Sequence, residues 1–291
     1  MLDLKMETFF VVCELMNFTK AAEVLHITQP AVSQQIHGLE EYYGTKLFRY
    51  EGKKMSLTKA GKILFQTAVT MKQDTQMLRD KIRNIDTAEE RLFFGATLTI
   101  GEFVMADKMI SVLKRFPTRQ LRMVEGNTKE LLGRLRKGEI DFAIVEGNFL
   151  KSEFDYQIFS KEKYIPVCSC HYSFEKKPLQ LLDLLNERLI TREKGSGTRD
   201  ILEKNMEARN LSLDEFKFTT EIGGINAIKT LVKAGCGITF LYEAAVKKEL
   251  LEGSLVEIEL CDFEVTHDFN LIWNKASVFA QQYQEISLLL K

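Results

Sequence analysis

Two short helix patterns joined by a tight connection, near the start of the chain, most constrain its fold. In "NFTKAAEVLHITQPAVSQQIHGLEEYYG", Thr19 and Thr28 each stand where a side chain can cap the free N–H groups of a helix. Pro30 falls in the first turn of the second helix, where its missing N–H costs nothing, and Gly44 is a plausible end. Only two residues join the helices, so the spacing predicts a helix-turn-helix.

The second of these helices has one apolar face and one polar, uncharged face. Val32, Ile36, Leu39 and Tyr43 follow helical spacing and are predicted to pack inward. Glutamine pairs well with adenine and serine with several base edges, so the polar face suits the major groove. The candidate base-contacting residues are Thr28, Gln29, Pro30, Ser33, Gln34 and His37. On this helix alone, the alternative that they are ordinary solvated side chains stays open.

Charge is distributed unevenly in this region, although the whole chain of 291 residues has a net charge of only −1. Residues 1–43 carry two basic and six acidic side chains, whereas residues 44–62 carry six basic and one acidic. The basic stretch "TKLFRYEGKKMSLTKAG" places a glycine between charged residues with apolar flanks, which predicts a hairpin wing. Phosphate contacts position a DNA reader and base contacts specify the sequence. The candidate phosphate-binding residues are Lys46, Arg49, Lys53 and Lys54.

A long helix is predicted after the wing, because about 30 residues follow Leu57 without proline and Thr58 can cap them. Apolar or small side chains recur there at alternating intervals of four and three residues, a heptad seam that favours a second helix as the partner. An amphipathic helix lying on its own domain is the alternative. The seam residues are Leu64, Ala68, Met71, Thr75, Leu78, Ile82 and Ile85.

From Arg91 onward, strand-like and helix-like segments alternate, which predicts an α/β fold with mainly parallel sheets. The predicted strands are 91–97, 120–126, 140–147, 154–159, 163–170, 188–193, 216–223 and 269–274. The predicted helices are 102–116, 128–139, 199–210, 225–235 and 277–291.

The N-terminal segment resembles the winged helix-turn-helix of LysR-type transcriptional regulators. The resemblance rests on the paired alanines of "TKAAEVL", on "QPAVS", on the later "LE" and "GTKLF", and on "LTKAG". One position departs from the family pattern, because Tyr50 stands where the family usually has arginine, with Arg49 one place earlier. The resemblance implies sequence-specific binding to double-stranded DNA at a palindromic operator. It also implies a homodimer held by antiparallel linker helices, or a homotetramer of two such dimers.

The remainder of the chain is similar to the family's effector domain, through "GATLTIGEFVMADKMISVLKRFP", "LRKGEIDFAIVEG" and "IKTLVKAGCGI". That similarity implies a two-lobed fold of the type II periplasmic-binding-protein kind. The predicted division is a winged helix-turn-helix over 1–57, a linker helix over 58–88, lobe I over 91–163 plus 267–291, and lobe II over 164–266.

Effector-binding residues are expected in the cleft between the lobes, because ligands of open α/β sheets bind beyond the carboxyl ends of strands. Helix N-termini with glycines are ready anion sites, and the guanidinium of Arg199 follows one of them. Tight turns and simple capping explain the same residues equally well. The candidates are Thr97, Leu98, Thr99, Ile100, Gly101, Thr128, Gly195, Ser196, Gly197, Thr198, Gly223 and Gly224. "GSGTR" in this place resembles family members that sense small anions, such as regulators of sulfur assimilation.

A ligand-responsive DNA-binding regulator is therefore the predicted function, with a small anionic metabolite as co-effector, no other cofactor and no metal. The chain has no HExxH, GxSxG or P-loop pattern, so we expect no enzyme activity. A cytoplasmic location and no membrane partner are expected, because there is no signal-peptide pattern and no long apolar run. Two alternatives stay open. One is a cytosolic solute-binding protein, and the other is a redox-sensing regulator that uses Cys236, close to the predicted cleft loops.

Overall fold

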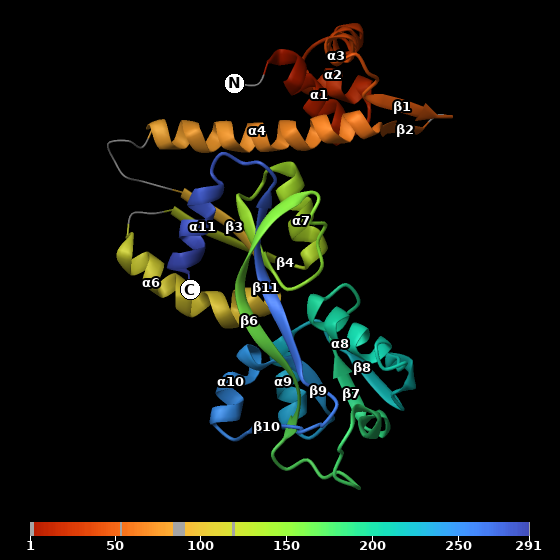
Figure 1. Cartoon of the computed structure of the whole chain (residues 1–291), viewed down its shortest axis with the longest axis vertical. Helices are drawn as coiled ribbons and strands as arrows, with labels where there is room; N and C mark the ends of the chain where they lie inside the picture. Colours follow the sequence, from red (N-terminus) through yellow and green to blue (C-terminus); the bar gives the residue numbers. More distant parts are fainter. Residues whose placement is uncertain (1–2, 53, 84–90, 118–119, 291) are drawn as a thin grey trace.

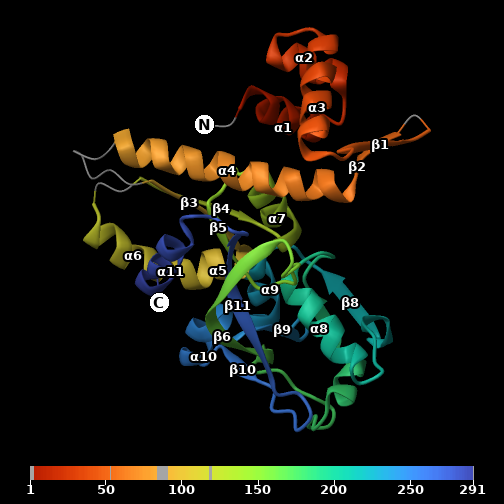
Figure 2. The same cartoon turned by 45° about the horizontal axis from the view of Figure 1, so that its top comes forward.

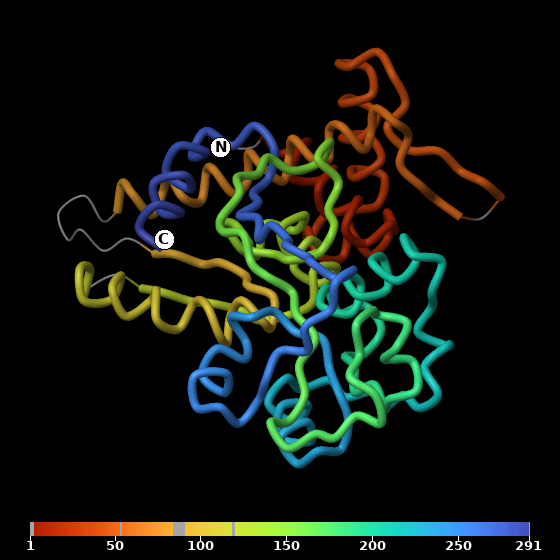
Figure 3. The backbone as a smooth tube through the Cα atoms, turned by 60° about the horizontal axis from the view of Figure 1, so that its bottom comes forward, coloured from red at the N-terminus to blue at the C-terminus, as the bar shows by residue number. Residues whose placement is uncertain are grey.

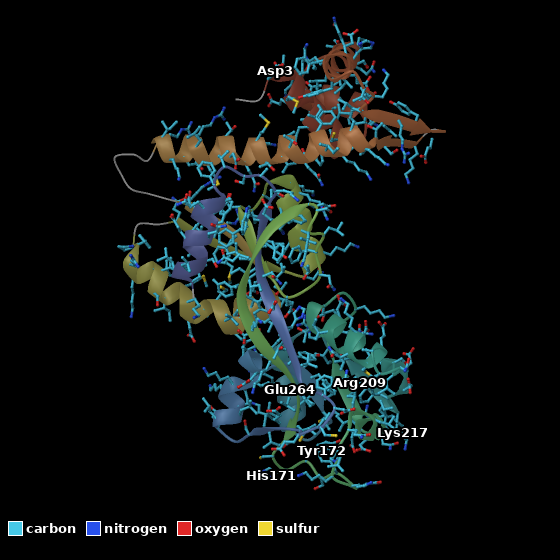
Figure 4. The ribbon with its side chains drawn as sticks, viewed as in Figure 1. Asp3, His171, Tyr172, Arg209, Lys217 and Glu264 are labelled. Carbon is cyan, nitrogen blue, oxygen red and sulfur yellow. The ribbon has the colours of Figure 1, made fainter. Side chains whose placement is uncertain are left out.

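The computed structural model describes residues 3–52, 54–83, 91–117 and 120–290. It has a helical N-terminal part, a long helix α4 beneath it, and a larger α/β part (Figure 1). Asp3 lies near one end of the long axis and His171 and Tyr172 near the other (Figure 4). Among the described residues, no helix is long and apolar enough to cross a membrane.

The predicted helix-turn-helix is confirmed in α2 (Phe18–Leu25) and α3 (Gln29–Tyr43), which pack on α1 (Leu4–Leu15). The Thr28 hydroxyl accepts a hydrogen bond from the Ala31 N–H at 3.3 Å, and α3 ends at Gly44 in the left-handed region. The predicted cap of α2 was wrong, because the Asn17 side chain, and not Thr19, accepts the free Lys20 N–H.

The inward face of α3 is mostly as predicted. Its buried residues Val32, Ile36 and Leu39 belong to a core that includes Phe9 and Phe10. Tyr43 was wrongly placed in that core: it is exposed, and its ring packs edge-on against Tyr42 at the end of the helix. The polar face of α3 is open to solvent, and the ring pair of Tyr42 and Tyr43 lies at the C-terminal end of the helix.

The predicted wing is an antiparallel hairpin of β1 (Phe48–Glu51) and β2 (Lys54–Leu57) that projects from the body of the molecule (Figure 2). Helix α4 (Lys59–Arg83) follows directly, and the Thr58 hydroxyl caps it by accepting the Gly61 N–H at 3.0 Å. A Cβ atom at Gly61 would lie 2.1 Å from the Leu47 carbonyl oxygen. Only glycine therefore allows α4 to begin so close to the wing.

Helix α4 packs on the chain's own effector part with one face. The Gln73 amide donates to the Ile140 carbonyl at 2.5 Å and its oxygen accepts from Asn274 at 2.8 Å. The Asp74 carboxylate accepts from Ser277. The heptad seam lies elsewhere on the helix: Leu64 and Ala68 join the N-terminal core, whereas Met71, Leu78 and Ile82 are exposed. Ile85 lies outside the described residues. The alternative role, packing on the chain's own domain, is therefore confirmed for one face of α4, and pairing of the exposed seam residues with a second helix stays a prediction.

The α/β part is built on one seven-stranded mixed sheet and one two-stranded parallel sheet. The large sheet has the order β10-β6-β11-β5-β3-β4, with β9 also pairing with β6. Its strands are β3 (Arg91–Thr97), β4 (Gln120–Gly126), β5 (Phe142–Val145), β6 (Phe154–Ser169), β9 (Thr239–Tyr242), β10 (Leu255–Glu257) and β11 (Val265–Asn274). The small sheet pairs β7 (Arg188–Thr191) with β8 (Phe218–Glu221).

Helices cover both sheets. They are α5 (Leu98–Ile100), the π-helix η1 (Gly101–Met105), α6 (Ala106–Arg115), α7 (Thr128–Lys137), the 3-10 helices η2 (Leu181–Asn186) and η3 (Leu213–Glu215), α8 (Gly197–Glu207), α9 (Ile225–Lys233), α10 (Glu243–Leu251) and α11 (Ala280–Leu289). The helix predicted over 102–116 therefore begins earlier, at Leu98, and contains a π-helical turn over Gly101–Met105. Such turns are rare and are frequent at functional sites.

Two predictions about the sheet were wrong. Most pairings in the large sheet are antiparallel, and only β3 pairs in parallel, with β4 and β5. The separate strands predicted over 154–159 and 163–170 form one strand, β6, which pairs with β11 along its first eleven residues. Both long strands run from one lobe into the other, so they join the two lobes as a continuous antiparallel ribbon (Figures 1 and 3).

Candidate effector and DNA-binding sites

A group of buried polar side chains joins the two lobes. The Thr99 hydroxyl in α5 lies 3.1 Å from the Thr198 hydroxyl in α8. The Thr198 hydroxyl donates to Oε1 of Glu146, directly after β5, at 3.2 Å. The Tyr164 hydroxyl of β6 donates to the Thr198 carbonyl at 2.9 Å. Four separate elements therefore converge on one buried point.

Two glycines permit this close approach. A Cβ atom at Gly197 would lie 2.6 Å from Cγ of Glu146, and one at Gly147 would lie 2.4 Å from the Thr128 hydroxyl. Neither glycine has a positive φ angle. Close packing, and not backbone strain, therefore requires glycine at both positions: Gly197 at the contact between the lobes, and Gly147 within lobe I.

Several polar atoms in this region are buried without a hydrogen-bond partner among the described residues. Glu146 is 2% exposed and Arg192, at the end of β7, is 3% exposed. Buried polar groups are nearly always paired, with protein, water or ligand, so unpaired atoms mark a place for a polar guest. The atoms are Nη1 of Arg192, Oε2 of Glu146, and the hydroxyls of Thr97, Thr128, Ser196 and Tyr242.

Burial controls the electrostatics of this group. It raises the pKa of Glu146 to about 7, although hydrogen bonds from threonines and the charge of Arg192 oppose the shift. Burial also raises the pKa of Tyr164 well above its ordinary value, and the Glu146 charge adds to that effect. The His267 ring lies 2.6 Å from the Glu146 carbonyl oxygen, and burial lowers its pKa. Near neutral pH the group therefore holds one guanidinium and one carboxyl that is close to half-ionised.

The structure brings six of the predicted effector-binding residues together in or beside this group: Thr97, Thr99, Thr128, Ser196, Gly197 and Thr198. The other candidates have different surroundings. Ile100 is in the core, Leu98 is half-buried, and Gly101 packs against Glu125. Gly195, Gly223 and Gly224 are exposed.

Two arginines flank this place. Arg199, the predicted one, is already paired, because it donates to Glu203 at 2.7 Å and to Glu221 at 2.6 Å. Arg192 is also buried; its Nε donates to Glu193 at 2.8 Å, and its Nη1 has no partner among the described residues. The sequence offered a signal for Arg192 and Glu146, since each is a charged residue at the carboxyl end of a predicted strand, where ligands of open α/β sheets bind.

Cys236 was predicted close to the cleft loops. It lies on the loop that follows α9, whereas the glycines predicted to face the cleft precede that helix. Nine helical residues separate the two ends, or about 14 Å at the usual rise. Cys236 therefore lies at the opposite end of α9 from the glycines that were expected beside it.

The candidate DNA-reading residues lie on or just before α3. Thr28, Gln29, Pro30, Gln34 and His37 are exposed and Ser33 is half-buried. The Gln29 amide donates to the Ser33 hydroxyl at 2.8 Å, so these two side chains hold each other on the exposed face.

The candidate phosphate contacts lie on the wing and just before it. Arg49 is exposed, donates to Ser56 at 3.1 Å and pairs with Glu51 at 3.3 Å. Lys54 is exposed, Lys53 lies outside the described residues, and Lys46 pairs with Glu40 at 2.6 Å. Tyr50, which stands in the usual arginine position, is also exposed.

A winged helix-turn-helix joined to a two-lobed α/β domain with a buried polar group between the lobes defines a ligand-responsive, DNA-binding class of protein. The model of the bacterial regulatory helix-turn-helix protein of the lysR family matches residues 4–62, and that of the LysR substrate binding domain matches residues 86–285. The chain belongs to the LysR family of DNA-binding transcriptional regulators. A plain solute-binding protein does not account for the match at the N-terminus.

Individual relatives agree with this assignment. The HTH-type transcriptional regulator CysL of Bacillus subtilis is 30% identical over 269 residues, covering 92% of this chain and 89% of the relative. Full-length LysG of Corynebacterium glutamicum, with bound effector Arg, has a TM-score of 0.72 at 15% identity over 100% of this chain and 98% of that one. The CcmR regulatory domain of Synechocystis PCC6803, in complex with 2-PG, has a TM-score of 0.60 at 20% identity, over 69% and 96%.

Proposed function

We propose that this regulator senses a small anion held between its lobes. The observation that carries the proposal is the unpaired Nη1 of buried Arg192, whose charge acts on Glu146, together with unpaired buried hydroxyls from both lobes. A guanidinium with hydroxyls around it is suited to a carboxylate or oxyanion. Since Thr99 belongs to lobe I and Thr198 to lobe II, an anion bound here contacts both lobes and biases their relative position.

We further propose that the chain acts in the cytoplasm as a homodimer or homotetramer on a palindromic operator. The exposed heptad residues of α4 support self-association, and dimers of winged helices read two-fold symmetric sites. We also propose that the parts of the chain divide at residues 57, 88, 163 and 266; the two long strands that join the lobes support this division.

Thermal-shift screening with small carboxylates, phosphate and sulfate tests the anion proposal. A bound anion raises the melting temperature of the folded chain. In Arg192→Gln, the stabilising anion should lose about 100-fold or more in affinity, because a charge-assisted contact is removed from a buried site. Arg209→Gln, a change of the same chemistry in lobe II, should leave the affinity unchanged. Equal affinity in Arg192→Gln and the parent chain would place the site elsewhere.

Gel-shift titration on DNA from the protein's own promoter region tests the division between reading helix and wing. In Ser33→Ala/Gln34→Ala, preference for the operator over an unrelated duplex should fall by about 10-fold or more, because base contacts specify the sequence. In Arg49→Ala/Lys54→Ala, affinity for both duplexes should fall together. The slope of the logarithm of affinity against the logarithm of salt concentration should become shallower by about two per chain, because two phosphate contacts are lost. Full sequence preference in the first variant would show that another face of the domain reads the bases.

A further inference from the structure

The buried group between the lobes holds an acid as well as a base, and this limits which anions fit. Glu146 accepts from Thr198 through Oε1, while its other oxygen, Oε2, has no partner among the described residues. A carboxylate oxygen is only an acceptor, so a guest that meets it must supply a hydrogen unless the carboxyl itself is protonated. A fully deprotonated oxyanion would place one negative oxygen against another.

Arg192 does not neutralise Glu146 by direct pairing. Its guanidinium forms its ion pair with Glu193 at 2.8 Å, although its charge still acts on Glu146 through space. The remaining titratable groups around the carboxyl are Tyr164 and Tyr242 on neighbouring strands, and the His267 ring on its carbonyl oxygen. None of the three supplies a fixed positive charge, since burial lowers the pKa of His267.

We infer that the buried group between the lobes selects an oxyanion that carries a hydrogen. The O–H group of the ligand donates to Oε2 of Glu146, and its negatively charged oxygens pair with the guanidinium of Arg192. The inference rests on the proposed anion site and names the chemical class of its ligand. It distinguishes hydrogen-bearing oxyanions, such as hydrogen phosphate or a hydrogen-bearing oxyanion of sulfur, from sulfate, which has no hydrogen near neutral pH. Sulfate brings no hydrogen of its own. Glu146 must therefore take up a proton from solvent before it can form a hydrogen bond with sulfate.

The selectivity therefore depends on pH. Burial places the pKa of Glu146 at about 7, so the carboxyl is mostly protonated below that pH and mostly ionised above it. Protonated Glu146 donates to sulfate, whereas ionised Glu146 repels it. Ionised Glu146 accepts from the O–H group that phosphate retains throughout this range.

Isothermal titration calorimetry of the full chain with sulfate and with phosphate, at about pH 6 and about pH 8.5 and constant ionic strength, tests the inference. For the parent chain, the sulfate dissociation constant should rise about tenfold per pH unit above 7, whereas that of phosphate should change much less. In Glu146→Gln, whose amide donates at every pH, sulfate affinity should become independent of pH. His267 is retained in this variant, so any contribution from its ring persists. Glu139→Gln, an exposed change in lobe I, should behave as the parent.

Two results would overturn the inference: sulfate affinity independent of pH in the parent chain, or a pH dependence that survives in Glu146→Gln. Either leaves the proposed anion site standing, because sulfate still binds. Failure of every anion to bind the parent chain at both pH values would contradict the anion site itself. The experiment thus separates the failure of the selectivity from the failure of the site.

Discussion

Replacing Glu146 with glutamine should make the ligand-free effector domain more stable than the parent above pH 7, by a margin that vanishes in acid. Burial holds the pKa of this carboxyl at about 7, against 4.5 for an ordinary glutamate. The folded state therefore binds the proton more tightly than the unfolded state, so the parent loses stability as pH rises from 4.5 and stops losing it above 7. Glutamine does not ionise, so the variant has no such loss.

The difference in the free energy of unfolding between variant and parent should grow by about 3 kcal/mol from acid pH to pH 8. This follows from the rise of the Glu146 pKa from 4.5 to about 7, at 1.36 kcal/mol per unit of pKa. For a domain of this size, that corresponds to about 5 to 10 °C in melting temperature. Trp273, the only tryptophan, is buried in lobe I on β11, so its fluorescence reports unfolding of this domain. Glu139→Gln should show no widening. Parallel pH profiles for Glu146→Gln and the parent would show that Glu146 is ionised without penalty in the folded chain.

Local patterns predicted the DNA-binding end of the chain well, because its structure depends on neighbours in sequence. The Thr28 cap, the Gly44 end and the hairpin wing each follow from a few adjacent residues. The two errors there have equally local causes. Asn17, two residues before Thr19, supplies the cap of α2, and Tyr43 stands in the last turn of α3, where its ring packs on Tyr42 and stays exposed.

The sheet was predicted less well, because strand direction depends on partners far away in the sequence. Strand β6 was divided in two because "SKEK" is polar, yet its side chains alternate between half-buried and exposed on the ribbon that joins the lobes. Alternation is typical of an antiparallel strand with one open face, whereas the second half of β6 is buried on both faces. A polar stretch was therefore mistaken for a break.

The cleft shows the same limit. Loops with glycine, serine and threonine were visible in the sequence, but the pairing of the charged side chains around them was not. Arg199 and Arg192 both flank "EKGSGT", and only the three-dimensional placement of Glu203 and Glu221 shows that Arg199 is already paired. Glu146 resembled any polar residue at the end of a strand until its burial between the lobes was known.

Substitution in the linker seam should have the largest effect on DNA binding. Leu78 and Ile82 are 51% and 59% exposed although both are large and apolar, and both continue the heptad of Leu64, Ala68 and Met71. An adjoining face of α4 is already occupied by lobe I through Gln73 and Asp74, while Leu78 and Ile82 stay exposed beside it. A second copy of α4 can therefore cover the seam without displacing the chain's own effector domain. In Leu78→Lys/Ile82→Lys, like charges would face each other across that seam.

The expected result for this variant is a single chain in solution with a folded effector domain. It should bind a palindromic operator at least about 100-fold more weakly than the parent, since each chain then holds one half-site alone and the gain from linking two sites is lost. Light scattering gives the assembly state, and gel-shift titration gives the affinity for a full site and for a half-site. Gln66→Lys, which adds the same charge to an exposed position of α4 outside the seam, should leave both unchanged. If the seam variant still dimerises and binds the full site normally, the dimer must form through another surface, and the exposed apolar residues of α4 need a different partner.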